Sequence, residues 1–136
     1  MILVDSSVWI DYFNGVICPE TNLLDGFLGK ESILMGDLIL SEVLQGFSND
    51  KDFQEAQQLL NLLPFREMLG RQVAIRSAEN YRLLRMKGIT VRKTIDVMIG
   101  TFCILNQLPL LHRDRDFDPM EKWLGLSTVY RGNPEQ

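Results

Sequence analysis

The chain has 136 residues, 46% of them hydrophobic and 24% charged, which suits one soluble globular domain with a substantial core. Its formal net charge of −4 argues, taken alone, against nucleic-acid binding, which normally requires a basic surface. No stretch approaches the roughly 18 consecutive apolar residues of a membrane span, and the N-terminus lacks the basic lead of a signal peptide, so we expect a cytoplasmic protein without membrane contact.

Cysteine and histidine usage narrows the chemistry further. Cys18 and Cys103 are the only cysteines and match no metal or redox spacing, so we expect two free thiols, with one disulfide as the alternative. His112 is the only histidine, which excludes catalysis that depends on several histidines.

Apolar runs and turn signals predict short strands alternating with helices. The first apolar run meets Asp5 and two serines, and helical periodicity follows, so Ser6 or Ser7 is expected to cap a helix. Asp37 and Thr94 are expected to cap later helices, the second of which is apolar nearly all round and should be buried. In chain order we expect strand 2–4, helix 6–13, helix 19–28, strand 32–35, helix 37–47, helix 50–63, a weak strand 65–68, helix 72–86, helix 94–106, strand 108–112, helix 119–124 and strand 126–130, with 131–136 as a frayed tail.

This alternation is typical of an α/β protein whose mostly parallel sheet is covered on both faces. Ligands of such sheets collect at the carboxyl ends of the strands. Asp5 follows the first strand, and Asp114 and Asp116 follow the strand that ends at His112, so three acids are expected at this edge. The alternative is that each is only a turn residue or a solvated loop charge.

Two helical acids are candidates for the same edge. Asp96 lies in the first turn of its helix, where an acid also complements the helix dipole, and Glu42 lies in a mostly apolar helix. Gly46 and Gly100 follow these acids by four residues, on the same helix face. Each glycine either leaves space beside its carboxylate for a metal, water or substrate, or permits close helix packing.

Four or five carboxylates in one pocket would repel one another unless a cation lay among them. Mg²⁺ and Mn²⁺ prefer carboxylate and water oxygens and commonly engage phosphate. The acids together therefore predict metal-assisted phosphoryl chemistry.

The negative net charge of the chain is unevenly distributed, because one segment is strongly basic. Residues 71–95 contain seven basic residues and one acid, a net charge of +6, which leaves −10 for the remainder. This segment is either a solvated helix face or a surface that attracts nucleic-acid phosphates. The candidate residues for such binding are Arg92, Lys93, Arg113 and Arg115.

Four segments in order and spacing resemble the PIN domain, specifically the VapC-type toxin ribonucleases of bacterial toxin–antitoxin pairs: ILVDSSVWIDYF, LILSEVLQGF, GITVRKTIDVMIGTFCI and LPLLHRDRDFDPM. The resemblance covers residues 1–130 as one PIN domain. It implies a three-layer α/β/α sandwich around the sheet, Mg²⁺- or Mn²⁺-dependent endonucleolytic cleavage of RNA, a homodimer, and a cognate antitoxin that blocks the acidic groove, often with an arginine.

The resemblance also implies roles for individual residues. The catalytic quartet would be Asp5, Glu42, Asp96 and Asp114; the metal ligands would be Asp5, Asp96, Asp114 and the accessory acid Asp116; and Ser6 would be a supporting hydroxyl residue. Glu42 would orient or deprotonate the attacking water, leaving a 5′-phosphate and a 3′-hydroxyl. His112 departs from the family pattern, which often has Thr or Ser there, and it would either touch substrate phosphate or face solvent.

Two further questions stay open at this stage. Trp9, Tyr12 and Phe13 support either a protein interface or the core. Other functions fit less well: a haloacid-dehalogenase-type phosphatase needs a second acid two residues after Asp5, and a receiver module needs an aspartate and a lysine at strand ends that the sequence does not offer convincingly. A catalytically silent PIN-like binding module would not require all four acids.

Overall fold

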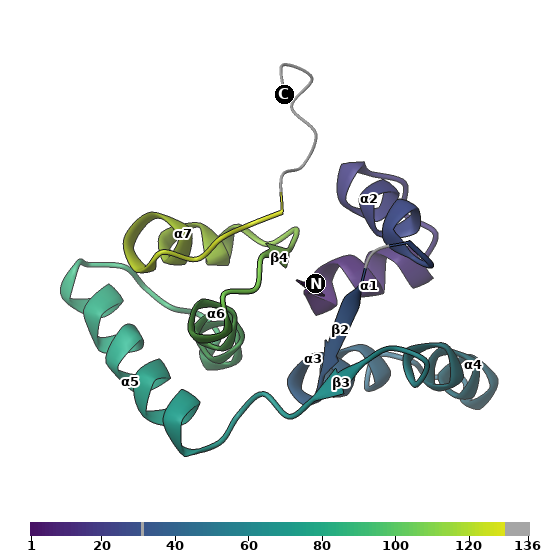
Figure 1. The fold of residues 1–136 in the computed structure, drawn as a ribbon, viewed down its shortest axis with the longest axis horizontal. Helices are drawn as coiled ribbons and strands as arrows, with labels where there is room; N and C mark the ends of the chain where they lie inside the picture. Colours follow the sequence, from purple (N-terminus) through teal and green to yellow (C-terminus); the bar gives the residue numbers. More distant parts are fainter. Residues whose placement is uncertain (31, 130–136) are drawn as a thin grey trace.

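Four short parallel strands form the sheet at the centre of the computed structural model, which describes residues 1–30 and 32–129. The strand order is β3-β2-β1-β4, with the longer strands next to each other (Figure 1). The predicted parallel sheet is therefore confirmed. The strands are β1 (Ile2–Val4), β2 (Ile33–Gly36), β3 (Phe65–Arg66) and β4 (Leu110–Leu111).

Helices lie on both sides of this sheet, as expected for a three-layer α/β/α sandwich. In Figure 1 the strands lie between a group of helices formed by α5, α6 and α7 and another formed by α1, α2 and α4. The helices are α1 (Ser6–Phe13), α2 (Pro19–Phe27), α3 (Asp37–Leu44), α4 (Asp50–Leu60), α5 (Arg71–Met86), α6 (Thr94–Asn106), α7 (Asp118–Leu124) and the single 3₁₀ turn η1 (Arg115–Phe117).

The pairing of β1 explains why acids from distant parts of the chain meet. Leu3 pairs with Leu34 of β2 on one side and with Leu110 of β4 on the other, and all three side chains are buried. The backbone N–H of Asp5 then donates to the carbonyl of Leu111 at 2.8 Å. Because all strands are parallel, the residues that follow β1 and β4 lie at the same edge.

Helix α6 is the buried helix that its apolar sequence predicts. Val97, Ile99, Phe102 and Cys103 are all in the core. Gly100 permits close packing, because a Cβ atom there would overlap the Sδ and Cε atoms of Met120.

Gly100 therefore leaves no space for a ligand beside Asp96. Gly46 lies past the end of α3 and lines a surface hollow with Phe13 and Phe47, and the residues lining that hollow do not include Glu42. The close-packing interpretation is confirmed for Gly100, whereas a Cβ atom at Gly46 would have only the Val43 carbonyl oxygen within 4 Å, so close packing does not explain Gly46.

The helix caps differ from the predictions. Asp5, rather than Ser6 or Ser7, is the N-cap of α1, because its extended backbone aims the carboxylate at the free N–H groups of the first turn. The other two predicted caps, Asp37 and Thr94, are the first residues of α3 and α6.

The predicted boundaries also shift. Helices α3 and α4 end at Leu44 and Leu60, each a few residues early, because the next N–H groups form turn hydrogen bonds. The strands predicted at 65–68 and 108–112 shorten to two residues each. Instead of strand 126–130, the structure has one bridge between Leu110 and Thr128. Residue 130 and the predicted tail 131–136 lie outside the described residues.

Other open questions are answered by burial. Cys18 and Cys103 are free thiols, as expected. Trp9 is fully buried and stacks on Phe13 with ring centroids 6.0 Å apart, so it belongs to the core. Within the described part of the chain, no helix is both long and apolar enough to cross a bilayer.

Candidate active site

Asp5 is a buried carboxylate at the end of β1. Its Oδ2 accepts hydrogen bonds from the backbone N–H of Ser7 at 3.0 Å and from the Ser7 hydroxyl at 2.6 Å. Its Oδ1 is also buried but has no hydrogen-bond partner within residues 1–30 and 32–129. Burial raises the pKa of Asp5, the Ser7 hydrogen bonds lower it, and the negative charge of Glu42 raises it further.

Glu42 approaches the same space from α3. The hydroxyl of Ser6 donates to Oε1 of Glu42 at 2.9 Å, so two adjacent serines of α1 hold two different acids. Ser6 therefore contacts the acids through Glu42, and its supporting role, which the family resemblance implies, stays a prediction.

Asp96 is the acid in the first turn of α6, and it is almost completely buried. Its Oδ2 has no hydrogen-bond partner among the described residues. Burial is the main reason that its pKa rises to about 7; Lys93 opposes the rise, while Asp5, Asp114 and Glu42 add to it. Such a carboxylate is costly to ionise without a nearby cation.

Asp114 and Asp116 follow β4. Asp114 caps η1 by accepting the backbone N–H of Asp116 at 2.9 Å. Together with Asp96, each of these acids offers one oxygen within 4.8 Å of the other two. Arg92 holds Asp116 through bidentate hydrogen bonds of 2.9–3.1 Å, so Asp116 is engaged by the chain itself.

Lys93 occupies the space between two of the acids. Its Nζ lies 3.7 Å from Oδ2 of Asp114 and 4.0 Å from Oδ2 of Asp96. The charge of Asp96 is the main cause of the raised pKa of Lys93, and the other acids of the site add to it. A cation of the chain therefore partly compensates the cluster.

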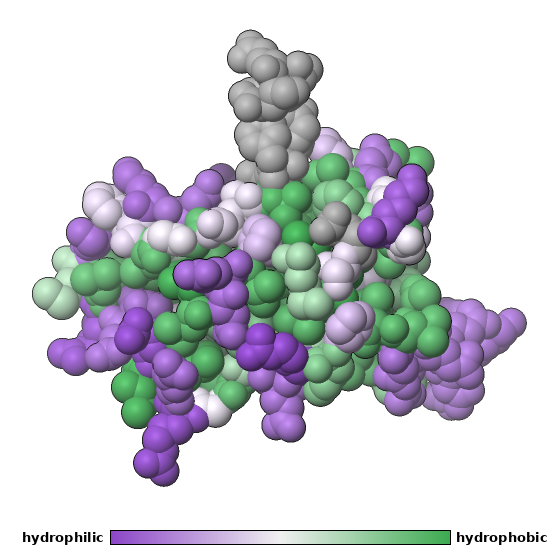
Figure 2. Space-filling model, viewed as in Figure 1, coloured by the Kyte–Doolittle hydropathy of each residue, from purple (hydrophilic) through white to green (hydrophobic). Residues whose placement is uncertain are grey.

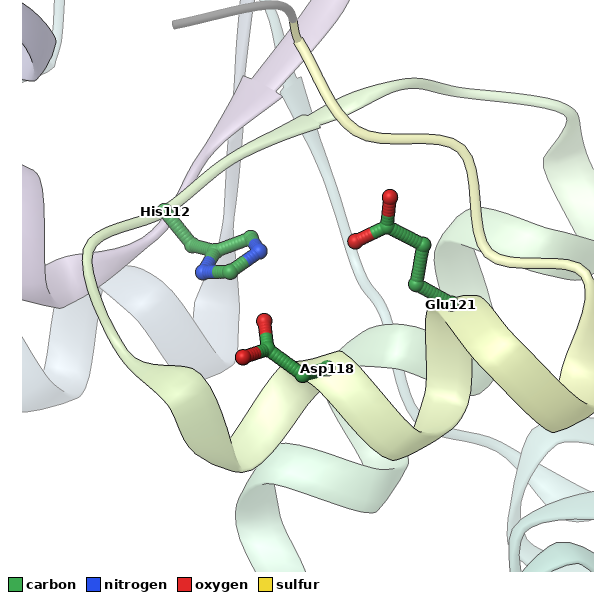
Figure 3. A group of neighbouring side chains, drawn as sticks. All are labelled: His112, Asp118 and Glu121. Atoms are coloured by element: carbon green, nitrogen blue, oxygen red, sulfur yellow. The ribbon is translucent and has the colours of Figure 1, made fainter.

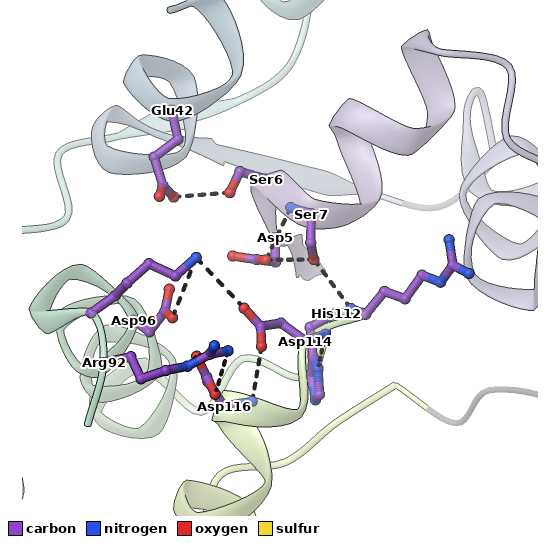
Figure 4. A network of polar contacts seen from close by, with 11 residues as sticks. Asp5, Ser6, Ser7, Glu42, Arg92, Asp96, His112, Asp114 and Asp116 are labelled. Atoms are coloured by element: carbon purple, nitrogen blue, oxygen red, sulfur yellow. Dashed lines mark hydrogen bonds and ion pairs between the residues drawn. The ribbon is translucent and has the colours of Figure 1, made fainter. Parts of the chain in front are cut away.

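Figure 4 shows the side chains of Asp5, Glu42, Asp96, Asp114 and Asp116 around one common space. The donor set consists of carboxylate oxygens, and two of these are buried without hydrogen-bond partners in the described chain, on Asp5 and Asp96. Hard divalent cations prefer such oxygen ligands, and Asp96, Asp114 and Asp116 each offer an ion one oxygen within 4.8 Å of the other two. The residues present therefore fit Mg²⁺ or Mn²⁺.

Comparison with known proteins agrees with this geometry. The family model described as "PIN domain" matches residues 2–122. The chain belongs to the PIN domain family. The relatives include VapC ribonuclease Mb1587 from Mycobacterium bovis and ribonuclease VapC11 from Mycobacterium tuberculosis, each 32% identical over 95% of this chain and 98% of the relative.

Solved structures share the fold of this PIN domain at lower sequence identity. VapBC2 from Rickettsia felis, bound to a promoter DNA fragment, is 15% identical with a TM-score of 0.75, covering 95% of this chain and 98% of that chain. A toxin–antitoxin complex from Klebsiella pneumoniae is 20% identical with a TM-score of 0.72, covering 97% and 100%. At these identities the likeness shows the fold alone.

The four predicted RNA-binding residues do not form one surface. Arg92 and Lys93 are directed at the acids of the PIN site. Arg113 is directed toward α1 and α2, where its Nη1 donates to Asp11 at 2.7 Å and its Nε lies 4.0 Å from Glu20.

Arg115 is exposed and lines a small hollow beside Arg92 and Lys93. Of the four, Arg113 is thus the one whose side chain points away from the acids of the candidate metal site. It contacts Asp11 of α1 and Glu20 of α2 instead.

His112 is buried, with 1% of its surface exposed, so the expectation that it faces solvent is wrong. Its Nδ1 accepts the backbone N–H of Asp114 at 3.2 Å, and its ring lies 4.9 Å from that of Phe117. Figure 3 shows the imidazole beside the carboxylates of Asp118 and Glu121, each with one atom within 4.8 Å of a ring nitrogen. Because Nδ1 already accepts a backbone N–H, His112 acts here as an anchor for the Asp114 segment.

Ser7 is the site residue that sequence reasoning missed. Its hydroxyl donates to Asp5 and accepts the backbone N–H of Arg113 at 3.2 Å, so it joins the start of α1 to the segment after β4. The signal was present in the sequence as two consecutive serines after an acid, but it did not reveal which serine serves which carboxylate.

Proposed function

We propose that this chain is a VapC-type endoribonuclease, the toxin of a toxin–antitoxin pair, which hydrolyses RNA phosphodiester bonds in the cytoplasm with Mg²⁺ or Mn²⁺. The observation that carries the proposal is the convergence of four acids from β1, α3, α6 and β4, two of them with buried, unsatisfied oxygens within the described chain. Support comes also from the relatives named VapC ribonuclease, which align over almost the whole chain.

Asp5, Asp96 and Asp114 would hold the metal ion, and Asp116 would join them if it released Arg92. When bound, the ion would neutralise charge on the phosphate and lower the pKa of water at the site. Ser7 orients Asp5 through two hydrogen bonds, and His112 anchors the backbone of Asp114. These contacts hold the carboxylates in position before substrate arrives.

Glu42 is the proposed acceptor of the proton of the attacking water. It is only half-buried, and the Ser6 hydrogen bond fixes the direction of one of its oxygens. Water would attack phosphorus and give one proton to Glu42 while the bond to the 3′-oxygen breaks, and the departing 3′-oxygen would take a proton from solvent, so the products are a 5′-phosphate and a 3′-hydroxyl. A 2′-hydroxyl nucleophile would need a base of its own, and His112, the only histidine, is buried against the Asp114 backbone.

The partners follow from the same assignment. We infer a cognate antitoxin that blocks the acidic pocket, since an arginine of a partner would find unsatisfied carboxylate oxygens there. One structural neighbour, from Klebsiella pneumoniae, is a toxin–antitoxin complex. We also propose a homodimer, and one PIN domain over residues 1–130.

Incubation of RNA with the purified chain, with Mg²⁺ and with EDTA, tests the proposal. Mg²⁺ should support cleavage, EDTA should abolish it, and sequencing should find 5′-phosphate ends. Asp96→Asn should reduce the rate at least about 100-fold, because it removes a metal-facing charge, whereas Glu55→Gln on exposed α4 should cleave normally. Wild-type cleavage by Asp96→Asn, or 2′,3′-cyclic phosphate ends, would contradict the assignment.

A further inference from the structure

Trp123 is an exposed aromatic side chain with cationic neighbours. It lies on α7 with 44% of its surface exposed, in contrast to the fully buried Trp9. The Nζ of Lys87 lies 4.1 Å from its ring centroid, and the Nζ of Lys122 lies 5.0 Å from it. Two ammonium groups therefore lie against one solvent-facing indole.

The surface around Trp123 is basic because α7 contacts α5, the helix that carries most of the basic segment (Figure 1). Arg82 and Arg85 are exposed near the end of α5, ahead of Lys87. The only acid of the segment, Glu79, is paired with Arg76 at 3.2 Å. Figure 2 shows hydrophilic side chains projecting over α5 at this end of the molecule.

The acids of α7 do not cancel this charge at the indole. Asp118 and Glu121 each place a carboxylate oxygen within 4.8 Å of a ring nitrogen of His112, and Glu121 also accepts the Thr128 hydroxyl at 3.3 Å. These contacts direct both acids toward the segments after β4 and α7. The cations at Trp123 are left facing solvent.

The indole also lies close to the carboxylate pocket. A small hollow lined by Leu84, Arg92, Asp96, Asp116 and Pro119 joins the end of α5 to the start of α7 beside the acids. Trp123 lies four residues further along α7 than Pro119, about 6 Å at 1.5 Å per residue. Nucleotides next to a phosphodiester bond held at the acids could reach it.

We propose that Trp123, with Lys87 and Lys122, is a subsite where a base of single-stranded RNA stacks beside the scissile bond. The inference rests on the proposed function and adds where the substrate is held. An indole face accepts any base, and flanking lysines neutralise adjacent phosphates. This occupant fits better than a protein partner, because the cores of protein interfaces are depleted in lysine.

The test is equilibrium binding of a fluorescein-labelled, unstructured RNA 12-mer in EDTA, where cleavage is absent. Trp123→Ala should weaken binding at least about fivefold, since stacking on one aromatic ring contributes about 1–3 kcal/mol per base, whereas Trp123→Phe should retain most of the affinity. Phe65→Ala is the matched control: Phe65 is another exposed aromatic residue, on β3, with no place in the subsite. Circular dichroism melts confirm that each variant folds.

Two further readouts separate stacking from a general loss of structure. Unlabelled RNA should quench the tryptophan emission of the wild-type chain but not that of Trp123→Phe, in which only the buried Trp9 remains. Lys87→Gln and Lys122→Gln should each reduce the slope of log affinity against log salt by about 1.

RNA binding by Trp123→Ala at wild-type affinity, or absent quenching in the wild type, would overturn the subsite. A Trp123→Ala variant that binds RNA normally but loses a protein partner would overturn it as well. Neither outcome would contradict the proposed function, which the Mg²⁺-dependent cleavage assay tests independently. Conversely, a chain that binds RNA through Trp123 but never cleaves it would overturn the proposed function and leave the subsite intact.

Discussion

The Nζ of Lys93 lies 3.7 Å from Oδ2 of Asp114, inside the ring of acids that forms the candidate metal site. The same ammonium lies 4.0 Å from Oδ2 of Asp96, an oxygen with no hydrogen-bond partner in the described residues. Lys93 and a divalent cation would therefore compete for the same oxygens. The lysine acts as a tethered counter-ion that lowers the electrostatic repulsion among the carboxylates while no metal is bound.

Removal of this tethered charge should strengthen metal binding. We expect Lys93→Met to raise the Mg²⁺ or Mn²⁺ affinity about 3- to 30-fold, a modest effect for a half-exposed ion pair in high dielectric. Isothermal titration calorimetry measures it. Lys93→Arg keeps the charge and should stay near the wild type, and Lys51→Met on exposed α4 controls for net charge. An unchanged or weaker metal affinity in Lys93→Met would show that the lysine does not compete.

Asp96 should make the metal-free protein less stable as the pH rises. Its pKa is about 7 in the folded chain and 3.8 in the reference state, so the folded protein binds the proton more tightly. The stabilising contribution of the Asp96 carboxyl is therefore fully present below about pH 4 and is lost as the pH rises from 4 to 7. We expect Asp96→Asn to be more stable than the wild type by about 2 kcal/mol at pH 8, less than the full shift implies because the pocket admits water.

Urea unfolding in EDTA at pH 4 and pH 8 measures this difference. At pH 4 the two chains should differ in free energy of unfolding by less than about 1 kcal/mol, because the wild-type carboxyl is protonated in the folded state and still about half protonated in the unfolded state. Addition of Mg²⁺ at pH 8 should stabilise only the wild type. Equal stability of the two chains at pH 8 would mean that Asp96 is ionised there without cost.

The hydroxyl of Ser7 should matter for metal binding through Asp5. Ser7→Ala removes the 2.6 Å hydrogen bond to a buried carboxylate, so the charged form of Asp5 loses a stabilising donor and the carboxylate loses its fixed direction. We expect Mg²⁺ affinity at pH 7 to fall about 3- to 10-fold. Ser7→Thr keeps a hydroxyl and should restore most of it. If Ser7→Ala binds Mg²⁺ as the wild type does, the hydrogen bond has no role in holding Asp5 for the ion.

His112 should act by anchoring the backbone of Asp114. His112→Asn places an amide oxygen near the position of Nδ1 and should preserve both Mn²⁺ affinity and cleavage within about threefold. His112→Phe keeps the ring volume but leaves the Asp114 N–H without this acceptor, and we expect at least tenfold weaker Mn²⁺ binding. Equal behaviour of the Asn and Phe variants would exclude the anchoring role, whatever their stability.

Much of the architecture could be predicted because it depends on local patterns. The apolar run of β1 predicts a buried strand, and the apolar residues on nearly every side of α6 predict a buried helix; both elements are buried. Parallel strands then place Asp5 and Asp114 at one edge by topology alone. The acids of the candidate site were accessible to sequence reasoning for this reason.

What could not be predicted depends on contacts between distant segments. The burial of His112 and the position of Lys93 among the acids follow from how α6, η1 and α7 pack. The overlap that a side chain at Gly100 would meet comes from Met120, twenty positions away. The shortening of the last strand to one bridge likewise reflects pairing geometry, which its β-branched and aromatic residues do not encode.

The acidic pocket draws its members from the first strand and from the last strand of the sheet. A chain that is still being synthesised therefore has Asp5 and Glu42 early but lacks Asp114 until the ribosome has translated the segment that follows β4. If all four acids are needed for cleavage, the growing chain has no partial nuclease activity. It cannot cleave nearby RNA until β4 pairs with β1.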